Sequence, residues 1–138
     1  MLVARRALPA MIERRRGDIV FITSANAVAP RTYQIGYTAS KAGLEGMART
    51  LRMDLEGTGV RSTIIRPGPT SSEFGTAWDG ERLAEVMESW KELGFLRHMH
   101  LLPAESVAAA VVAAVTAPAG THLDEIQINP QAPIRSEN

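Results

Sequence analysis

Three short segments carry the hydrophobic pattern of β-strands. Residues 19–22 form a continuous apolar run between polar neighbours, and residues 60–66 and 124–129 are the two other candidates. A continuous apolar run of this length is typical of a strand that is buried on both faces of a parallel sheet. We therefore predict that residues 18–23, 60–66 and 124–129 form one parallel sheet.

Four segments around these strands are predicted to be helices. The clearest covers residues 34–56, and two others cover residues 1–15 and the Ala- and Val-rich residues 104–117. Residues 78–92 also look helical, but their pattern is weak. Strands that alternate with helices predict an α/β fold with a doubly wound parallel sheet. Apolar residues three and four positions apart mark the face that a helix turns toward the core. In the two longest patterns these are Leu2, Leu8, Met11 and Ile12, and Leu44, Met47, Ala48, Leu51 and Leu55.

Composition and charge place the chain among ordinary globular proteins. Its 138 residues suffice for one domain, and its formal net charge of zero gives no reason to expect a nucleic acid partner. No apolar run reaches the roughly 18 residues that a membrane span needs, and no long apolar segment marks a signal peptide. The absence of cysteine excludes disulfides and thiolate metal sites and fits a reducing compartment. We therefore expect a cytoplasmic protein with no membrane partner.

A tyrosine, a lysine and a serine give the chain its clearest chemical signal. Tyr37 and Lys41 are four residues apart, so a helix would place both side chains on one face, one turn apart. A lysine in that position favours the phenolate form of the tyrosine. Such a tyrosine can exchange a proton with an alcohol oxygen. Ser24 follows the first predicted strand, where its hydroxyl can bond the same oxygen.

These residues, together with Pro67 and Gly68 after the second predicted strand, resemble the catalytic half of a short-chain dehydrogenase/reductase. The resemblance implies a Rossmann-type sheet and an oxidoreductase that moves a hydride between NAD or NADP and a small-molecule carbonyl or secondary alcohol. It implies that Tyr37 is the general acid/base, that Lys41 assists it and binds the nicotinamide ribose, and that Ser24 positions the substrate.

The resemblance also assigns the loop after the second predicted strand to the cofactor. In this family the loop leaves the carboxyl end of a strand, where open α/β sheets bind ligands, and it supports the nicotinamide. Ser72 matches a hydroxyl position that reaches the cofactor carboxamide, and Thr70 is the neighbouring candidate. The implied cofactor-binding residues are Tyr37, Lys41, Pro67, Gly68, Thr70 and Ser72.

The resemblance covers only the C-terminal half of that family. The sequence contains no Gly-x-x-x-Gly-x-Gly turn for a dinucleotide pyrophosphate and no selector between NAD and NADP. The family's catalytic asparagine would precede Met1, and Asn26 is not its equivalent because it follows the serine. Helix 1–15 begins without a capping residue, as expected of a helix cut in its middle.

Residues 1–138 are accordingly expected to form a single partial Rossmann domain that binds a dinucleotide weakly, if at all, and does not catalyse hydride transfer by itself. The alternative is a truncated, non-catalytic relative that serves as an association module. Upstream coding sequence with a glycine-rich turn would distinguish a clipped enzyme from such a relative.

Two of the predicted helices suggest that the protein associates with a second copy of itself. Helices 1–15 and 34–56 resemble the pair through which members of this family dimerise, which implies a homo-oligomer. A stripe of small side chains on the second helix would let another helix approach closely. These residues are Ala39, Gly43, Gly46 and Thr50.

The segment after the cofactor loop has two interpretations. Residues 73–102 vary in this family and cover the substrate, so here they form a possible lid, flanked by Trp78 and Trp90, or they only pack. Residues 130–138 are predicted to be a tail. No acidic cluster accompanies the three histidines, so we interpret them as surface or loop residues and predict no metal site. They are His98, His100 and His122.

Overall fold

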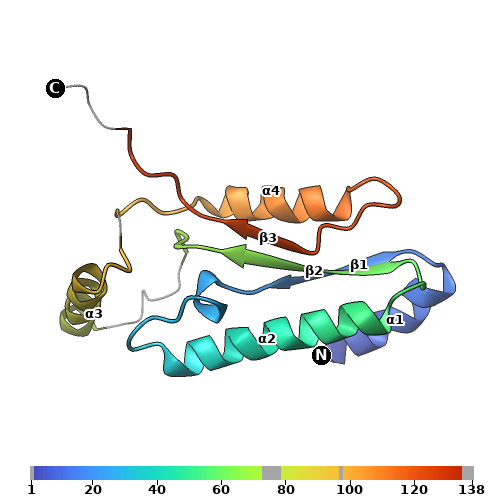
Figure 1. Cartoon of the computed structure of the whole chain (residues 1–138), viewed down its shortest axis with the longest axis horizontal. Coiled ribbons are helices and arrows are strands. Elements are labelled where there is room, and N and C mark those ends of the chain that lie inside the picture. Colours follow the sequence, from blue (N-terminus) through green and yellow to red (C-terminus); the bar gives the residue numbers. More distant parts are fainter. Residues whose placement is uncertain (1, 73–78, 97, 135–138) are drawn as a thin grey trace.

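A parallel sheet forms the centre of the molecule (Figure 1). The computed structural model of the chain describes residues 2–72, 79–96 and 98–134. In these ranges the strands are β1 (Gly17–Ile22), β2 (Val60–Pro67) and β3 (Glu125–Ile128), all parallel and in the order β1-β2-β3. This confirms the predicted sheet, and each strand end lies within one residue of its predicted position.

Helices cover both faces of this sheet, which confirms the predicted doubly wound α/β fold. In Figure 1, α1 (Leu2–Glu13) and α2 (Ile35–Asp54) lie on one side of the strands, and α4 (Ala104–Val115) lies on the other. The third helix, α3 (Gly80–Glu92), lies beyond the carboxyl ends of the strands. A 3-10 turn, η1 (Ala25–Ala27), follows β1. No helix in the described ranges is long and apolar enough to cross a membrane.

The hydrophobic core lies between α2 and the two strands β1 and β2. Phe21, Ala48 and Ile64 form its buried cluster, and three partly buried side chains pack against it. Those three are Ile19, Leu44 and Leu51. The middle strand is the most buried element, because β2 has a neighbouring strand on each side and a helix on each face.

The prediction that the first strand is buried on both faces was wrong. Only Gly17 and Phe21 of β1 are buried, and Ile22 is 39% exposed. The reason is the place of the strand in the sheet, since among the described residues β1 pairs only with β2. The continuous apolar pattern showed that the segment is a strand, but it did not show how many neighbours cover it.

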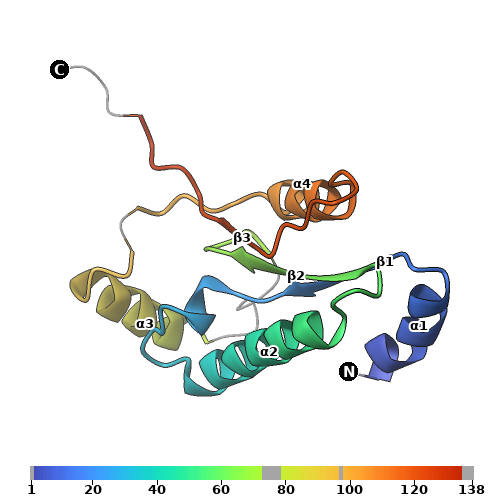
Figure 2. The same cartoon turned by 45° about the vertical axis from the view of Figure 1, so that its right-hand side comes forward.

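Two predicted helix faces also need correction. Met47 is 37% exposed, because the face of α2 that meets the sheet centres on Ala48, and Met47 lies about 100° around the helix from it. No described residue of α1 is buried, and Leu2 and Ile12 of its predicted core face are exposed. This helix lies at the edge of the sheet beside β1 (Figure 2), so its apolar face does not reach the core.

Candidate active site

The end of β1 fixes the position of Ser24. The strand ends at Ile22, and Ser24 adopts an extended conformation as the N-cap of η1. Its Oγ accepts a hydrogen bond of 3.2 Å from the backbone N–H of Asn26. Such a cap satisfies a backbone donor that the short turn would otherwise leave without a partner. Ser24 therefore stands at the carboxyl end of a parallel strand, where open α/β sheets bind ligands.

The first turns of α2 carry Tyr37 and Lys41 on one side of the helix. The Lys41 Nζ lies 5.7 Å from the centre of the Tyr37 ring. The same Nζ donates a hydrogen bond of 3.1 Å to the backbone carbonyl of Ile22. This bond joins the helix to the last residue of β1 and so keeps the lysine beside the strand end that precedes Ser24.

A buried amide pair that the sequence analysis missed holds η1 against the start of α2. Asn26 and Gln34 are only 4% and 9% exposed, and the Nδ2 of Asn26 donates to the Oε1 of Gln34. Gln34 is the N-cap residue of α2. Nothing in the sequence pairs two amides eight residues apart, so this contact was visible only in three dimensions.

The loop after β2 is pinned to its neighbours by backbone hydrogen bonds. Gly68 N–H donates to the carbonyl of Ile128 over 2.7 Å, and Leu102 N–H donates to the carbonyl of Pro69 over 2.8 Å. A Cβ on Gly68 would lie 2.5 Å from Asn129 Oδ1 and 3.3 Å from the carbonyl oxygen of Ile128, so a larger residue here would require the Asn129 side chain to move. The Thr70 hydroxyl donates to the Gly68 carbonyl over 2.9 Å and braces the turn.

All the residues assigned to catalysis or cofactor by the sequence line one cavity of about 740 Å³. Side chains from α3 and α4, among them Trp90, Val107 and Val111, form much of its apolar wall. The volume falls in the range of about 300–1,000 Å³ that is usual for small-molecule sites. The assigned residues that line it are Ser24, Tyr37, Lys41, Pro67, Gly68, Thr70 and Ser72.

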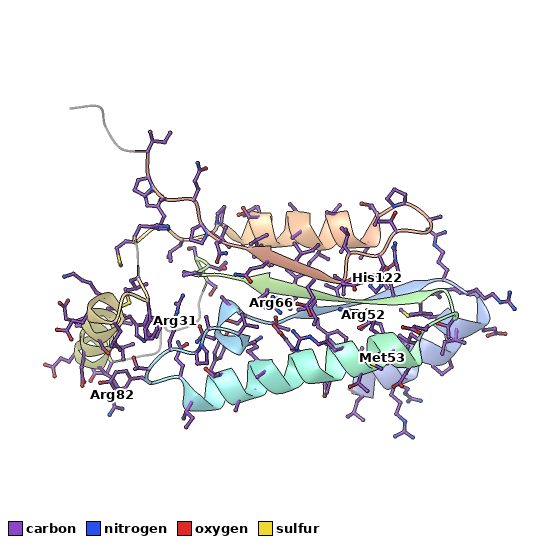
Figure 3. All side chains as sticks on the ribbon, in the orientation of Figure 1. Arg31, Arg52, Met53, Arg66, Arg82 and His122 are labelled. Atoms are coloured by element: carbon purple, nitrogen blue, oxygen red, sulfur yellow. The ribbon has the colours of Figure 1, made fainter. Side chains whose placement is uncertain are left out.

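A buried ion pair lies beneath this cavity. Two bonds of 2.8 Å join the guanidinium of Arg66 to the carboxylate of Glu45, and the Thr23 hydroxyl donates to the same carboxylate over 2.9 Å. The two charged side chains are 8% and 2% exposed. Figure 3 shows Arg66 between the sheet and α2.

Electrostatics keep both partners of this pair charged. Burial alone would raise the pKa of Glu45, but the hydrogen bonds from Arg66 and Thr23 and the nearby positive charges together hold that pKa below its usual value. The Glu45 carboxylate in turn raises the pKa of Arg66. Glu125 on β3 accepts a further bond of 2.9 Å from Arg66.

This ion pair connects the three segments that carry the candidate site. Thr23 directly precedes Ser24, Arg66 directly precedes Pro67, and Glu45 follows Lys41 by one helical turn. The pair therefore fixes the two strand ends and α2 relative to one another, so its geometry positions the residues that line the cavity.

The loop before Tyr37 supports α3. The indole Nε1 of Trp90 donates a bond of 3.1 Å to the carbonyl of Thr32, and the guanidinium carbon of Arg31 lies 5.3 Å from the centre of the Trp90 ring. Trp90 is 8% exposed. Trp78, the other tryptophan of the predicted lid, lies outside the described residues.

The histidines contact protein groups or one another. The rings of His98 and His100 are 5.9 Å apart, and His122 lies 3.3 Å from an oxygen of Asp124. Within residues 2–72, 79–96 and 98–134, no group of three or more histidine, cysteine, aspartate or glutamate side chains could hold a metal ion.

Comparison with known sequences identifies similar proteins. Residues 1–83 match a protein family described as short chain dehydrogenase. An uncharacterized oxidoreductase of Mycobacterium tuberculosis is 34% identical over 131 residues, which are 94% of this chain and 49% of that protein. A 3-oxoacyl-acyl-carrier-protein reductase of Mycobacterium avium is 35% identical over 86 residues, or 62% of this chain and 34% of that protein. The chain thus spans half or less of the length of these relatives.

Two solved structures of serine dehydrogenases are also similar to this chain. The closed form of a serine dehydrogenase complexed with NADP+ matches with a TM-score of 0.75 and 27% identity, and the match covers 98% of this chain and 54% of that one. The serine dehydrogenase of Escherichia coli matches with a TM-score of 0.67 and 30% identity over 91% of this chain and 45% of that one.

Proposed function

Because this chain belongs to the short-chain dehydrogenase family, we propose that it supplies the Ser-Tyr-Lys site of an NAD(P)-dependent oxidoreductase that acts on a small carbonyl compound or secondary alcohol. One observation carries the proposal. Ser24 follows β1 and Tyr37 and Lys41 lie on α2, yet all three line a single cavity that the loop after β2 also lines.

In this proposal Tyr37 moves the proton. During reduction its phenol gives a proton to the substrate oxygen as the carbonyl carbon gains a hydride, and during oxidation the phenolate takes that proton back. Lys41, whose Nζ lies 5.7 Å from the ring centre, places a positive charge beside the tyrosine. The Ser24 hydroxyl donates a hydrogen bond to the substrate oxygen and so fixes it within reach of the phenol.

The loop after β2 fits the nicotinamide end of a dinucleotide, which supplies or accepts the hydride when bound. The hydrogen bond from Gly68 to Ile128 keeps the loop against β3, and the neighbouring residues of the loop line the same cavity. We assign Pro67, Gly68, Thr70 and Ser72, with Lys41, to this half of the cofactor. The similar serine dehydrogenase was solved in complex with NADP+, which supports a dinucleotide as the cofactor.

We also propose that α3 covers the bound substrate. Leu83, Met87 and Trp90 of this helix line the cavity, and their apolar side chains would exclude water from the reacting carbonyl. The hydrogen bond from Trp90 to Thr32 ties the cover to the segment that leads into Tyr37.

Titration of the isotope-labelled chain with NADH and NADPH tests the cofactor assignment. We expect weak binding of a dinucleotide, with NMR shift changes centred on the loop after β2 and on the start of α2. Lys41→Ala should remove these changes. Shift changes centred elsewhere, or unchanged in Lys41→Ala, would contradict the assignment, and saturable micromolar affinity would contradict the expected weakness.

Turnover tests the role of Tyr37. Any reduction of a carbonyl substrate by this chain, alone or completed with a dinucleotide-binding half, should fall by about 10²–10⁴-fold in Tyr37→Phe, which lacks the proton donor. Tyr33→Phe is the matched control, because Tyr33 is 62% exposed and is not among the residues that line the cavity. Equal rates in the two variants would refute the proposed proton transfer.

A further inference from the structure

The charge of the cavity goes beyond what the Ser-Tyr-Lys site requires. Two cationic side chains, Arg31 and Lys41, line it, and no aspartate or glutamate of the described chain does. Lys41 already donates to the carbonyl of Ile22 and lies beside Tyr37. The positive charge of Arg31 has no comparable use in the proposed reaction.

The surroundings of Arg31 distinguish it from Arg66, which is buried, and from Arg61, which like Arg31 is partly buried. Arg66 and Arg61 each bond a carboxylate, at 2.8 Å and 2.7 Å. Within residues 2–72, 79–96 and 98–134, Arg31 shows neither an ion pair nor a hydrogen bond, and its guanidinium lies over the ring of Trp90. Burial lowers the pKa of Arg31 below its ordinary value, and no acidic side chain of the described residues offsets that effect.

The contact with Trp90 leaves the hydrogen-bonding capacity of Arg31 unused. A cation–π contact engages the charge of the guanidinium but satisfies none of its five N–H donors. A guanidinium remains protonated in proteins, so burial cannot remove its charge. Stacking on an aromatic ring also restricts the side chain before a ligand arrives, which reduces the entropy lost on binding.

The unused N–H donors of Arg31 lie in the same cavity as the candidate site. Arg31 precedes Tyr37 by six residues in the same loop-to-helix segment, and both line the cavity. Figure 3 places Arg31 between α3 and the strand ends that carry Ser24 and Pro67. An anion bound to the guanidinium would therefore lie under α3, in the same cavity as the reacting oxygen.

We propose that Arg31 binds the carboxylate of the substrate, an inference that rests on the proposed function. The preferred substrates are then small oxo acids or hydroxy acids rather than neutral ketones or alcohols. The planar fork of an arginine matches a carboxylate through two parallel hydrogen bonds. None of the described lining residues is acidic, so a carboxylate on Arg31 meets no like charge among them and displaces no ion pair that they form with Arg31.

Binding of acetoacetate and its methyl ester tests this proposal without any need for turnover. The two probes share a ketone and differ in one negative charge. We expect acetoacetate to bind at least about tenfold more tightly, the effect of a charge-assisted hydrogen bond, and to shift the Arg31 Nε–H and Trp90 indole NMR signals. Equal affinity for the two probes, or binding of neither, would overturn the proposal.

Variants assign the effect to Arg31. Arg31→Gln should weaken acetoacetate by about tenfold or more and leave the ester unchanged, whereas Arg31→Lys should retain part of the preference because it keeps the charge. Arg82→Gln is the control. This substitution also removes one positive charge, but Arg82 is a residue of α3 that is not among those lining the cavity. An equal loss for acid and ester in Arg31→Gln would show that Arg31 only positions α3, and would overturn carboxylate binding.

This test separates the two proposals. If acetoacetate binds through Arg31 but Tyr37→Phe has no effect on turnover, the carboxylate site stands and the proton-transfer role fails. If Tyr37 proves essential but acid and ester bind alike, the proposed reaction stands and the substrate class fails.

Discussion

Glu45 and Arg66 meet through two bonds of 2.8 Å in the interior between α2 and β2, with 2% and 8% of their side chains exposed. Neither residue was singled out as half of a pair by the sequence, yet their contact joins the strand ends and the helix that carry the candidate site. A buried pair of this kind adds little net stability compared with apolar residues, but it is costly to break.

We predict that Glu45→Gln destabilises the protein by about 3–5 kcal/mol, because it leaves the Arg66 charge buried and only partly compensated. Chemical denaturation followed by circular dichroism measures the change in unfolding free energy. Lys91→Gln is the control, since Lys91 and its partner Glu88 are 71% and 62% exposed and such a pair contributes at most about 1 kcal/mol. Similar losses of unfolding free energy in the two variants would show that the buried pair is no more costly to break than an exposed one.

The same pair predicts how stability depends on pH. The pKa of Glu45 in the folded protein is held below the ordinary value of 4.5. Folding thus favours the ionised form of Glu45. The contribution of this carboxylate to the free energy of unfolding is present above pH about 4.5 and is lost as the pH falls through the folded pKa. Glu125 adds in the same direction, since hydrogen bonds from Arg49 and Arg66 lower its pKa. We expect acid titration of unfolding free energy to show a shallower slope in Glu45→Gln than in the wild type, and identical slopes would refute this.

The backbone conformation of Gly59 should make this position intolerant of a side chain. Its φ of +80° lies in the left-handed region, and an added Cβ would overlap the carbonyl oxygen of Arg15. Gly59→Ala should therefore destabilise the turn before β2 by at least about 1–2 kcal/mol. Gly80→Ala is the matched control, because nothing lies within 4 Å of the Cβ it would add. Thermal unfolding of both variants checks the prediction, which fails if their midpoints shift equally.

The exposed side of α2 predicts an interface. Ala39, Gly43, Gly46 and Thr50 are all exposed on this helix, and the backbone there is open to a second helix. We predict a symmetric dimer through α1 and α2, which Gly46→Leu should weaken by steric overlap. Sedimentation velocity measures this, with Ala109→Leu on α4 as a control for added apolar bulk on the opposite face. A sedimentation profile that Gly46→Leu leaves unchanged would exclude the interface.

The sequence by itself determined the helices and strands and singled out Ser24, Tyr37 and Lys41 as candidates for the proposed chemistry. Strands and helices follow from local periodicity, and the spacing of four residues between Tyr37 and Lys41 fixes a shared helix face whatever surrounds the helix. The parallel sheet also followed from the alternation of strands and helices. Each of these inferences depends on residues that are neighbours in the chain.

The tertiary structure alone decided which surfaces are covered and which distant side chains meet. It made β1 an edge strand among the described residues, exposed Met47 and placed the carboxylate of Glu45 against Arg66, 21 residues away. It also stacked Arg31 on Trp90, from a segment that the sequence showed only as a weak helix. Burial and pairing are properties of contacts between segments far apart in the chain, and no local pattern encodes them, so the cavity and its charge became visible only in three dimensions.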